Sequence, residues 1–255
     1  MSKERGKSYA LSPFRRLVVD LMHFSQHVPA VAIERRMNLA AIAAARQYCS
    51  PRPAWTTVFA KAFGLVSRTY PELRRAYMPL PYPRLYEHPY STVSLNVERL
   101  LPVEPIVLQC LIKRPENRSL AEIDAIVRRN QATPLEELRW YRRSLTMARL
   151  PWLIRRFVWW ATLKIFGRER CHNFGTFSVS SIASQGAGIV HLVPVLTASL
   201  HYGLFDDDGN LDVRLTFDHR VMDGATAART LVELEHMLHG PILTELHTMR
   251  WAAAA

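Results

Sequence analysis

Residues 217–224 read Phe-Asp-His-Arg-Val-Met-Asp-Gly, and this stretch says more about the fold than any other part of the 255-residue sequence. Apolar residues alternate with polar ones over residues 211–217, which predicts a half-buried strand that leads into His219. The aspartate and glycine that close the stretch then begin a helix. We expect this helix to cover residues 225–238 and to stop at Gly240-Pro241. The stretch is therefore predicted to be a turn between a strand and a helix.

His219 has the chemistry that a general base needs. A neutral imidazole, with an ordinary pKa of about 6.5, can accept a proton from a thiol, hydroxyl or amine at neutral pH. Asp223 could hold the turn by pairing with an arginine, and Gly224 would allow a substrate to approach the backbone closely. The spacing alone also fits a packed or solvated histidine, so the residues around it must decide.

The rest of the chain alternates between helical and strand patterns. Helices are expected over residues 12–26, 39–47, 56–68 and 119–129, and further strands over residues 28–33, 91–97, 106–112, 176–181 and 193–202. Ser119 and Glu122 form a capping-box pattern at the start of the fourth helix. Because the sequence has no internal repeat and no long linker, residues 1–255 are expected to form one mixed α/β domain.

The composition fits a globular protein with a substantial core, since 49% of the residues are hydrophobic and 22% are charged. The three cysteines, Cys49, Cys110 and Cys171, have neither a metal-ligand spacing nor a disulfide framework, which suits a reducing compartment. The charged N-terminus is not followed by an apolar signal core. We therefore expect a cytoplasmic protein that holds no metal.

The net charge of +11 permits nucleic acid, an anionic membrane, anionic substrates or an acidic carrier protein as partners. Nucleic acid is not expected, because no zinc-finger or RNA-binding signature accompanies the charge. Nine basic residues lie in the segment 139–170 against one acid, Glu169, with aromatic residues interleaved. Arg155 and Arg156 interrupt its apolar part, which makes it a poor transmembrane span. On a helical wheel these arginines and Lys164 do not share one face.

Residues 218–229, Asp-His-Arg-Val-Met-Asp-Gly-Ala-Thr-Ala-Ala-Arg, resemble the signature of the catalytic cores of dihydrolipoyl acyltransferases, the inner subunits of 2-oxoacid dehydrogenase complexes. The wider superfamily includes chloramphenicol acetyltransferase and peptide-synthetase condensation domains. Those relatives typically carry His-His where this chain has Asp218-His219, as in the dihydrolipoyl branch. Weaker similarities follow the family's order at residues 14–22, 28–29, 59–62, 70–73 and 175–182.

The resemblance implies a chloramphenicol acetyltransferase-like fold, an α+β two-layer sandwich with a mixed sheet covered by helices, assembled as a homotrimer. It implies a CoA-dependent acyltransferase in which coenzyme A enters a channel and the active site lies between chains. His219 would be the general base that deprotonates the acceptor. Ser180 would donate a hydrogen bond to the tetrahedral oxyanion, a contribution of about 3 kcal/mol to lowering the barrier. Asp223 would hold the histidine loop by pairing with Arg15 or Arg16.

Further residues are predicted to line the substrate site: Ser181, Gly224, Arg15, Arg16 and His191, the last of them on a strand. We also expect two departures from the family: no lipoyl domain ahead of the core, and an insertion at residues 139–170. This segment could pack at the trimer interface, dock on anionic lipid, or receive an acidic acyl carrier protein. The last two roles favour a lipidic or long acyl group.

Two alternatives to this acyltransferase stay open. One is a standalone acetyl- or succinyltransferase core that serves a 2-oxoacid dehydrogenase complex. The other is a non-catalytic trimeric scaffold of the same fold. A cytoplasmic enzyme, with peripheral attachment to the inner membrane if the basic segment binds lipid, is the leading hypothesis.

Overall fold

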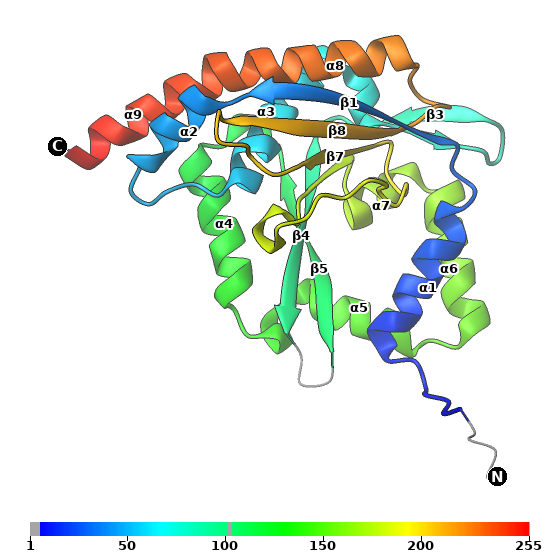
Figure 1. Ribbon diagram of the computed structural model, residues 1–255. Helices are drawn as coiled ribbons and strands as arrows, with labels where there is room; N and C mark the ends of the chain where they lie inside the picture. Colours follow the sequence, from blue (N-terminus) through cyan, green and yellow to red (C-terminus); the bar gives the residue numbers. More distant parts are fainter. Residues whose placement is uncertain (1–5, 101–103, 255) are drawn as a thin grey trace, which may run out of the picture.

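The computed structural model describes residues 6–100 and 104–254, and within these ranges six strands form one mixed sheet in the order β1-β8-β7-β6-β4-β5 (Figure 1). The strands of this sheet are β1 (Ala30–Asn38), β4 (Thr92–Leu100), β5 (Pro105–Lys113), β6 (Phe177–Ser180), β7 (Ala198–Tyr202) and β8 (Asn210–Asp218). A separate hairpin pairs β2 (Arg75–Met78) with β3 (Arg84–Glu87). The predicted fold, a mixed sheet covered by helices, is confirmed.

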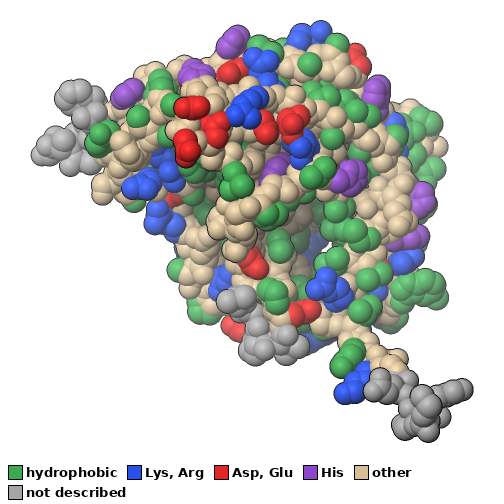
Figure 2. All heavy atoms as spheres, in the orientation of Figure 1, with side chains coloured by type: hydrophobic (Ala, Val, Ile, Leu, Met, Phe, Trp, Pro, Cys, Tyr) green, Lys and Arg blue, Asp and Glu red, His purple; other side chains and the backbone are tan. Residues whose placement is uncertain are grey.

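The longer helices are α1 (Pro13–Ser25), α2 (Ala40–Gln47), α3 (Trp55–Thr69), α4 (Leu120–Ala132), α5 (Arg139–Arg149), α6 (Trp152–Lys164), α7 (Gly167–Phe174), α8 (Gly224–Met237) and α9 (Leu243–Ala254). α1 lies beside α5 and α6, and α5 also contacts the edge strand β5 (Figure 1). The space-filling view shows the molecule hollowed between α1 and the sheet (Figure 2). No helix in the described ranges is long and apolar enough to cross a membrane.

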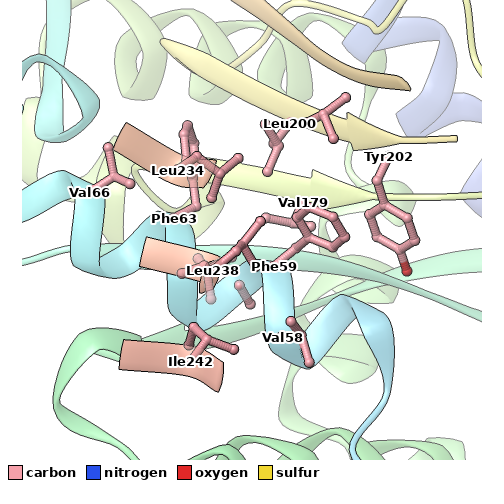
Figure 3. Close-up of a cluster of buried hydrophobic side chains, with 14 of the residues drawn as sticks. Val58, Phe59, Phe63, Val66, Val179, Leu200, Tyr202, Leu234, Leu238 and Ile242 are labelled. Carbon is pink, nitrogen blue, oxygen red and sulfur yellow. The ribbon is translucent and has the colours of Figure 1, made fainter. Parts of the chain in front are cut away.

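The main hydrophobic core lies between one face of the sheet and the helices α3 and α8 (Figure 3). Phe59 of α3 stacks on Tyr202 of β7 with ring centroids 4.5 Å apart, and Phe63 meets Phe177 of β6 edge to face at 4.9 Å. Such aromatic pairs stabilise by about 0.5–1.5 kcal/mol beyond the area that they bury. This packing fixes β6 and β8, the two strands that carry Ser180 and lead to His219.

The opposite face of the sheet is polar, because side chains alternate along each strand. Four hydroxyl residues lie in register across β4, β6, β7 and β8: Ser94, Ser178, Ser199 and Thr216. Ser178 Oγ donates to Ser199 Oγ at 2.8 Å, whereas the outer two hydroxyls have no hydrogen-bond partner among the described residues. The chain therefore has an apolar face for its own core and a polar face that carries Ser180.

The segment 139–170 folds into α5, α6 and the start of α7, and several of its basic residues are used inside the chain. Arg155 and Arg156 both pair with Asp20 of α1, which is completely buried. Arg170 is buried and donates to the carbonyl oxygens of Tyr77 and Val195, at 3.2 and 2.9 Å. The lack of a single basic helix face, predicted from the helical wheel, follows from these inward contacts.

The helix that begins at Gly224 does not stop at Gly240-Pro241, so this prediction is wrong. A π-helical turn, Leu238–Ile242, joins α8 to α9, which continues to Ala254. Proline lacks an N–H and clashes with the carbonyl one turn back, and a widened turn accommodates both effects within a helix. Leu238 and Ile242 are completely buried, so core packing favours the continuation.

Candidate active site

His219 lies at the end of β8, on the turn that the sequence predicts. Its side chain is exposed, and its backbone N–H donates to the carbonyl oxygen of Pro29 at 3.0 Å. The neighbouring Asp218 is completely buried. Its carboxylate accepts a hydrogen bond from the Arg220 backbone N–H at 3.0 Å and two from the Arg220 guanidinium, at 2.9 and 2.7 Å. Arg220 in turn stacks over the ring of Tyr77, 4.5 Å from its centroid. A bidentate ion pair therefore holds the turn while the imidazole faces solvent.

Asp223 begins α8 as its N-cap. Its carboxylate accepts a hydrogen bond from the Thr226 backbone N–H at 2.7 Å, which satisfies one of the free donors of the first turn. This bond holds the pKa of Asp223 below its ordinary value, with a smaller contribution from the positive charge of Arg229. The carboxylate thus orders the end of the turn that carries His219.

The predicted pairing of Asp223 with Arg15 or Arg16 does not occur within the described part of the chain. Nη2 of Arg15 lies 3.8 Å from Oε2 of Glu104, and Nε of Arg16 donates a hydrogen bond to the carbonyl oxygen of Leu11 at 3.2 Å. The physical reason is the position of α1, whose first turn lies against the end of the β4–β5 hairpin. Both arginines are therefore used at that end of the molecule.

Ser180 ends β6, on the polar face of the sheet, and is 8% exposed. Its backbone oxygen accepts a hydrogen bond from Nδ1 of His201 at 3.1 Å, because Nε2 of that ring already accepts one from the Ile189 N–H. Burial lowers the pKa of His201, which favours this neutral form. No described residue hydrogen-bonds to Ser180 Oγ, so this hydroxyl has no use within the described part of the chain.

The other predicted lining residues have different surroundings. Ser181 Oγ donates to the carbonyl oxygen of Tyr202 at 2.8 Å and accepts from the Ala183 N–H, so it shapes the chain after β6. His191 is exposed in an irregular loop and is not on a strand, which corrects that prediction. β7 begins only at Ala198, because the preceding loop is held by contacts such as Arg170 to Val195 rather than by strand pairing. A Cβ at Gly224 would meet nothing within 4 Å.

Ser180 and His219 lie toward opposite ends of the sheet. In register, Ser180 is opposite His201 of β7, and His201 is opposite Arg214 of β8. His219 follows Arg214 by five residues, a distance of roughly 17 Å along the strands. Since a general base and an oxyanion donor must both be within hydrogen-bond reach of one reacting group, a single chain does not hold both at one site.

A group of cations lies behind the His219 turn, and no sequence pattern predicted it. Lys164 at the end of α6 and Arg170 of α7 lie around a small pocket with Arg220 and Tyr77. Burial and the nearby charges of Arg220 and Arg170 lower the pKa of Lys164. The described residues contain no group of three or more His, Cys, Asp or Glu side chains that could hold a metal ion.

No protein-family model and no curated protein matches the sequence, but solved structures match the fold. Dihydrolipoamide acetyltransferase from Azotobacter vinelandii has a TM-score of 0.68 at 17% identity, covering 94% of this chain and 95% of that one. A truncated catalytic core of the 2-oxoacid dehydrogenase multienzyme complex from Thermoplasma acidophilum has a TM-score of 0.66 at 17% identity, covering 92% of this chain and 99% of that one.

The chain has the fold of an acyltransferase catalytic core. Chloramphenicol acetyltransferase is a more distant match, with a TM-score of 0.52 at 11% identity over 86% of this chain and 94% of that chain. The acyltransferase fold extends over nearly the whole of both chains in each comparison. The resemblance stated from the His219 motif is therefore confirmed at the level of the fold.

Proposed function

We propose that the protein is a CoA-dependent acyltransferase that works as a homotrimer. It moves an acyl group between a CoA or carrier-protein thioester and an acceptor. His219 of one chain is the general base, and Ser180 of the next chain is the oxyanion donor. The observation that carries this proposal is the separation of an exposed histidine and an unpaired serine hydroxyl on one sheet of an acyltransferase fold.

The spacing of His219 and Asp223 supports the assignment. In the Azotobacter vinelandii enzyme, the catalytic mechanism has been investigated through a serine, a histidine and an asparagine four residues after the histidine. In this chain Asp223 follows His219 by the same four residues, and Ser180 precedes both. Asp223 accepts the hydrogen bond of a helix cap, a role that an asparagine side chain also fills.

The reaction follows from these groups. The imidazole of His219 takes the proton from the thiol or hydroxyl of the acceptor, whose sulfur or oxygen attacks the thioester carbonyl carbon. The carbonyl oxygen becomes an oxyanion, and the Ser180 hydroxyl donates a hydrogen bond to it. When the tetrahedral intermediate collapses, the carbon–sulfur bond to CoA breaks. The CoA thiolate leaves with the proton that His219 held. The Asp218–Arg220 pair and the Asp223 cap keep the imidazole in position.

Thiol release from acetyl-, succinyl- and longer acyl-CoA tests the proposal, with dithiothreitol and dihydrolipoamide as acceptors. The wild-type protein should release CoA from at least one thioester much faster than His219→Ala does. Equal rates across the whole panel would contradict the enzyme and favour the non-catalytic trimeric scaffold. Activity confined to acetyl- or succinyl-CoA with dihydrolipoamide would favour the standalone core of a dehydrogenase complex.

The surface of α6 supports an association with anionic lipid. Leu153, Phe157 and Trp160 follow one face of this helix and are 68%, 64% and 37% exposed. Arg149 is exposed four residues before Leu153, and the guanidinium of Arg156 lies over the ring of Trp152, with 5.4 Å to its centroid. Exposed apolar and aromatic residues beside cations are typical of helices that lie in a membrane interface. This face is proposed as a peripheral membrane contact.

Sedimentation with vesicles of anionic and of neutral lipid tests this contact. Leu153→Glu should reduce binding to anionic vesicles at least tenfold, whereas Leu85→Glu, at an exposed leucine of β3, should leave it unchanged. If the wild-type protein fails to bind vesicles, the contact is wrong. In that case a loss of trimers in Leu153→Glu would assign this face to the subunit interface.

A further inference from the structure

A cavity of about 370 Å³ lies between α1, α5, α6 and the edge strand β5, where Figure 2 shows the molecule hollowed. Its volume is in the range of small-molecule sites, which is about 300–1,000 Å³. Most of its lining is apolar or aromatic and comes from four helices and one strand: Phe14, Leu17, Leu108, Trp140, Trp159 and Phe174. Such a lining suits a hydrocarbon chain.

The cavity begins one strand away from Ser180. Leu95 of β4 is in register with Val179 of β6, and both belong to the hydrophobic core. The next residue of each strand, Asn96 and Ser180, must therefore lie on the opposite, polar face, on strands about 4.8 Å apart. Asn96 lines the cavity. A group whose carbonyl oxygen lies at Ser180 can thus extend past Asn96 into the apolar space.

Trp159 forms a firmly held part of the cavity wall. It is 9% exposed, its ring lines the cavity, and its indole N–H has no hydrogen-bond partner among the described residues. The ring is held on both sides, since Phe24 stacks on it at 6.1 Å and Phe174 lies at 5.1 Å between centroids. The ring is therefore a fixed aromatic wall against which methylene groups can pack.

The wall that closes the cavity comes from the part of the sequence that departs from the acyltransferase family. Trp140 and Ser144 belong to α5, and Trp159 belongs to α6, all within the segment 139–170. Without this segment, the space beside Asn96 would be open on that side. The segment 139–170 therefore supplies one wall of an apolar space next to Ser180, the proposed oxyanion donor.

We propose that this cavity holds the acyl chain of the thioester, and that the preferred donor carries a medium or long hydrocarbon chain rather than an acetyl group. The inference rests on the proposed function for the identity of the ligand. An acetyl group at Ser180 would leave the cavity unfilled. A chain of about ten carbons would bury its methylene groups against the aromatic wall and gain affinity with each one.

The first test fills the cavity from α5. Ser144→Phe should lower kcat/KM for decanoyl-CoA at least tenfold relative to acetyl-CoA, because the new ring occupies the space of the chain. Thr146→Phe is the matched control, since Thr146 is exposed on the same helix and does not line the cavity. In this control, the ratio of kcat/KM for decanoyl-CoA to kcat/KM for acetyl-CoA should equal that of the wild type. An unchanged ratio in Ser144→Phe would overturn the proposal.

The second test measures binding without turnover, so that it separates the two proposals. Isothermal titration calorimetry compares the unreactive thioethers decyl-CoA and ethyl-CoA on the native oligomer of His219→Ala. Decyl-CoA should bind at least tenfold more tightly than ethyl-CoA, and Ser144→Phe in the same background should remove the difference. Equal affinities would overturn the cavity proposal even if acetyl-CoA is turned over. Tight binding of decyl-CoA supports the cavity proposal even if no thioester is turned over. The lack of turnover would contradict only the proposed function.

Discussion

The two ends of the six-stranded sheet differ in what they offer a substrate. At the end of β8, His219 is exposed on a turn that the buried Asp218–Arg220 pair holds from behind. At the end of β6, Ser180 is nearly buried, and no described residue hydrogen-bonds to its hydroxyl. In the proposed mechanism, the proton acceptor faces outward at one end and the oxyanion donor lies in a sheltered place at the other. Under this proposal, each chain carries two half-sites rather than one site.

The largest effect is expected at the exposed end. His219→Ala should lower kcat about 10³-fold with little change in KM, because it removes the group that takes the proton in the transition state. Steady-state thiol release from the best acyl-CoA donor measures this. His236→Ala, at an exposed histidine of α8, is the control and should keep full activity. A loss of less than about tenfold in His219→Ala would contradict the assignment.

At the sheltered end, Ser180→Ala should lower kcat about 10²-fold, again at nearly constant KM, because one preorganised oxyanion donor is lost. Ser178→Ala removes a hydroxyl from the same strand and face, but one that is already bonded to Ser199. Its kcat should stay within about twofold of the wild type. If the two variants lose activity equally, Ser180 has no special role and the comparison of the two ends fails.

The turn behind His219 should be sensitive to its buried carboxylate. Asp218→Asn leaves the Arg220 guanidinium without its counter-charge and should lower the free energy of unfolding by about 3 kcal/mol. A smaller loss of kcat, about tenfold, is expected from the displaced imidazole. Denaturant unfolding and thiol release measure the two effects. Asp212→Asn makes the same change at an exposed site of β8 and should alter neither the free energy of unfolding nor kcat. Equal losses in both variants would show that Asp218 does not position the His219 turn.

The smallest effect is expected at Asp223, which caps α8 and has no arginine partner among the described residues. Asp223→Ala should lower the melting temperature by about 2–4 °C and kcat by less than about threefold. The Thr226 hydrogen bond lowers the pKa of Asp223 in the folded protein. The stabilisation of the fold by this bond is therefore complete above the pKa of Asp223 in the unfolded chain, about 3.9, and is lost as the pH falls through the lower pKa of the folded protein. The difference in melting temperature between Asp223→Ala and the wild type should therefore become smaller at acidic pH. A loss of activity as large as that of His219→Ala would show that Asp223 does more than cap a helix.

The sequence predicts the site's two ends because local patterns determine them. Alternation over residues 211–217 places a strand before His219, and the capping aspartate and glycine after it start α8. The Ser119–Glu122 capping box is confirmed for the same reason, since a cap depends on residues three apart. The order of the motifs along the chain was enough to predict the acyltransferase fold, although overall identity to the solved structures compared above is only 11–17%.

What the sequence did not reveal depends on contacts between residues far apart in the chain. Asp20 pairs with Arg155 and Arg156, 135 and 136 residues away, and no spacing rule predicts this. The same limit applies to the cavity beside Asn96, whose walls come from helices separated by more than a hundred residues. The continuation of α8 through Pro241 was missed because core packing outweighed a local stop signal.

A mixed trimer tests most directly whether the two half-sites belong to different chains. His219→Ala and Ser180→Ala chains carrying different tags are co-expressed, and trimers that contain both are purified through the two tags. In such a trimer, one of the three junctions joins an intact His219 to an intact Ser180, so activity should recover to about one third of the wild type. Each variant alone should stay nearly inactive. Mixed trimers no more active than their parents would contradict an active site shared between chains.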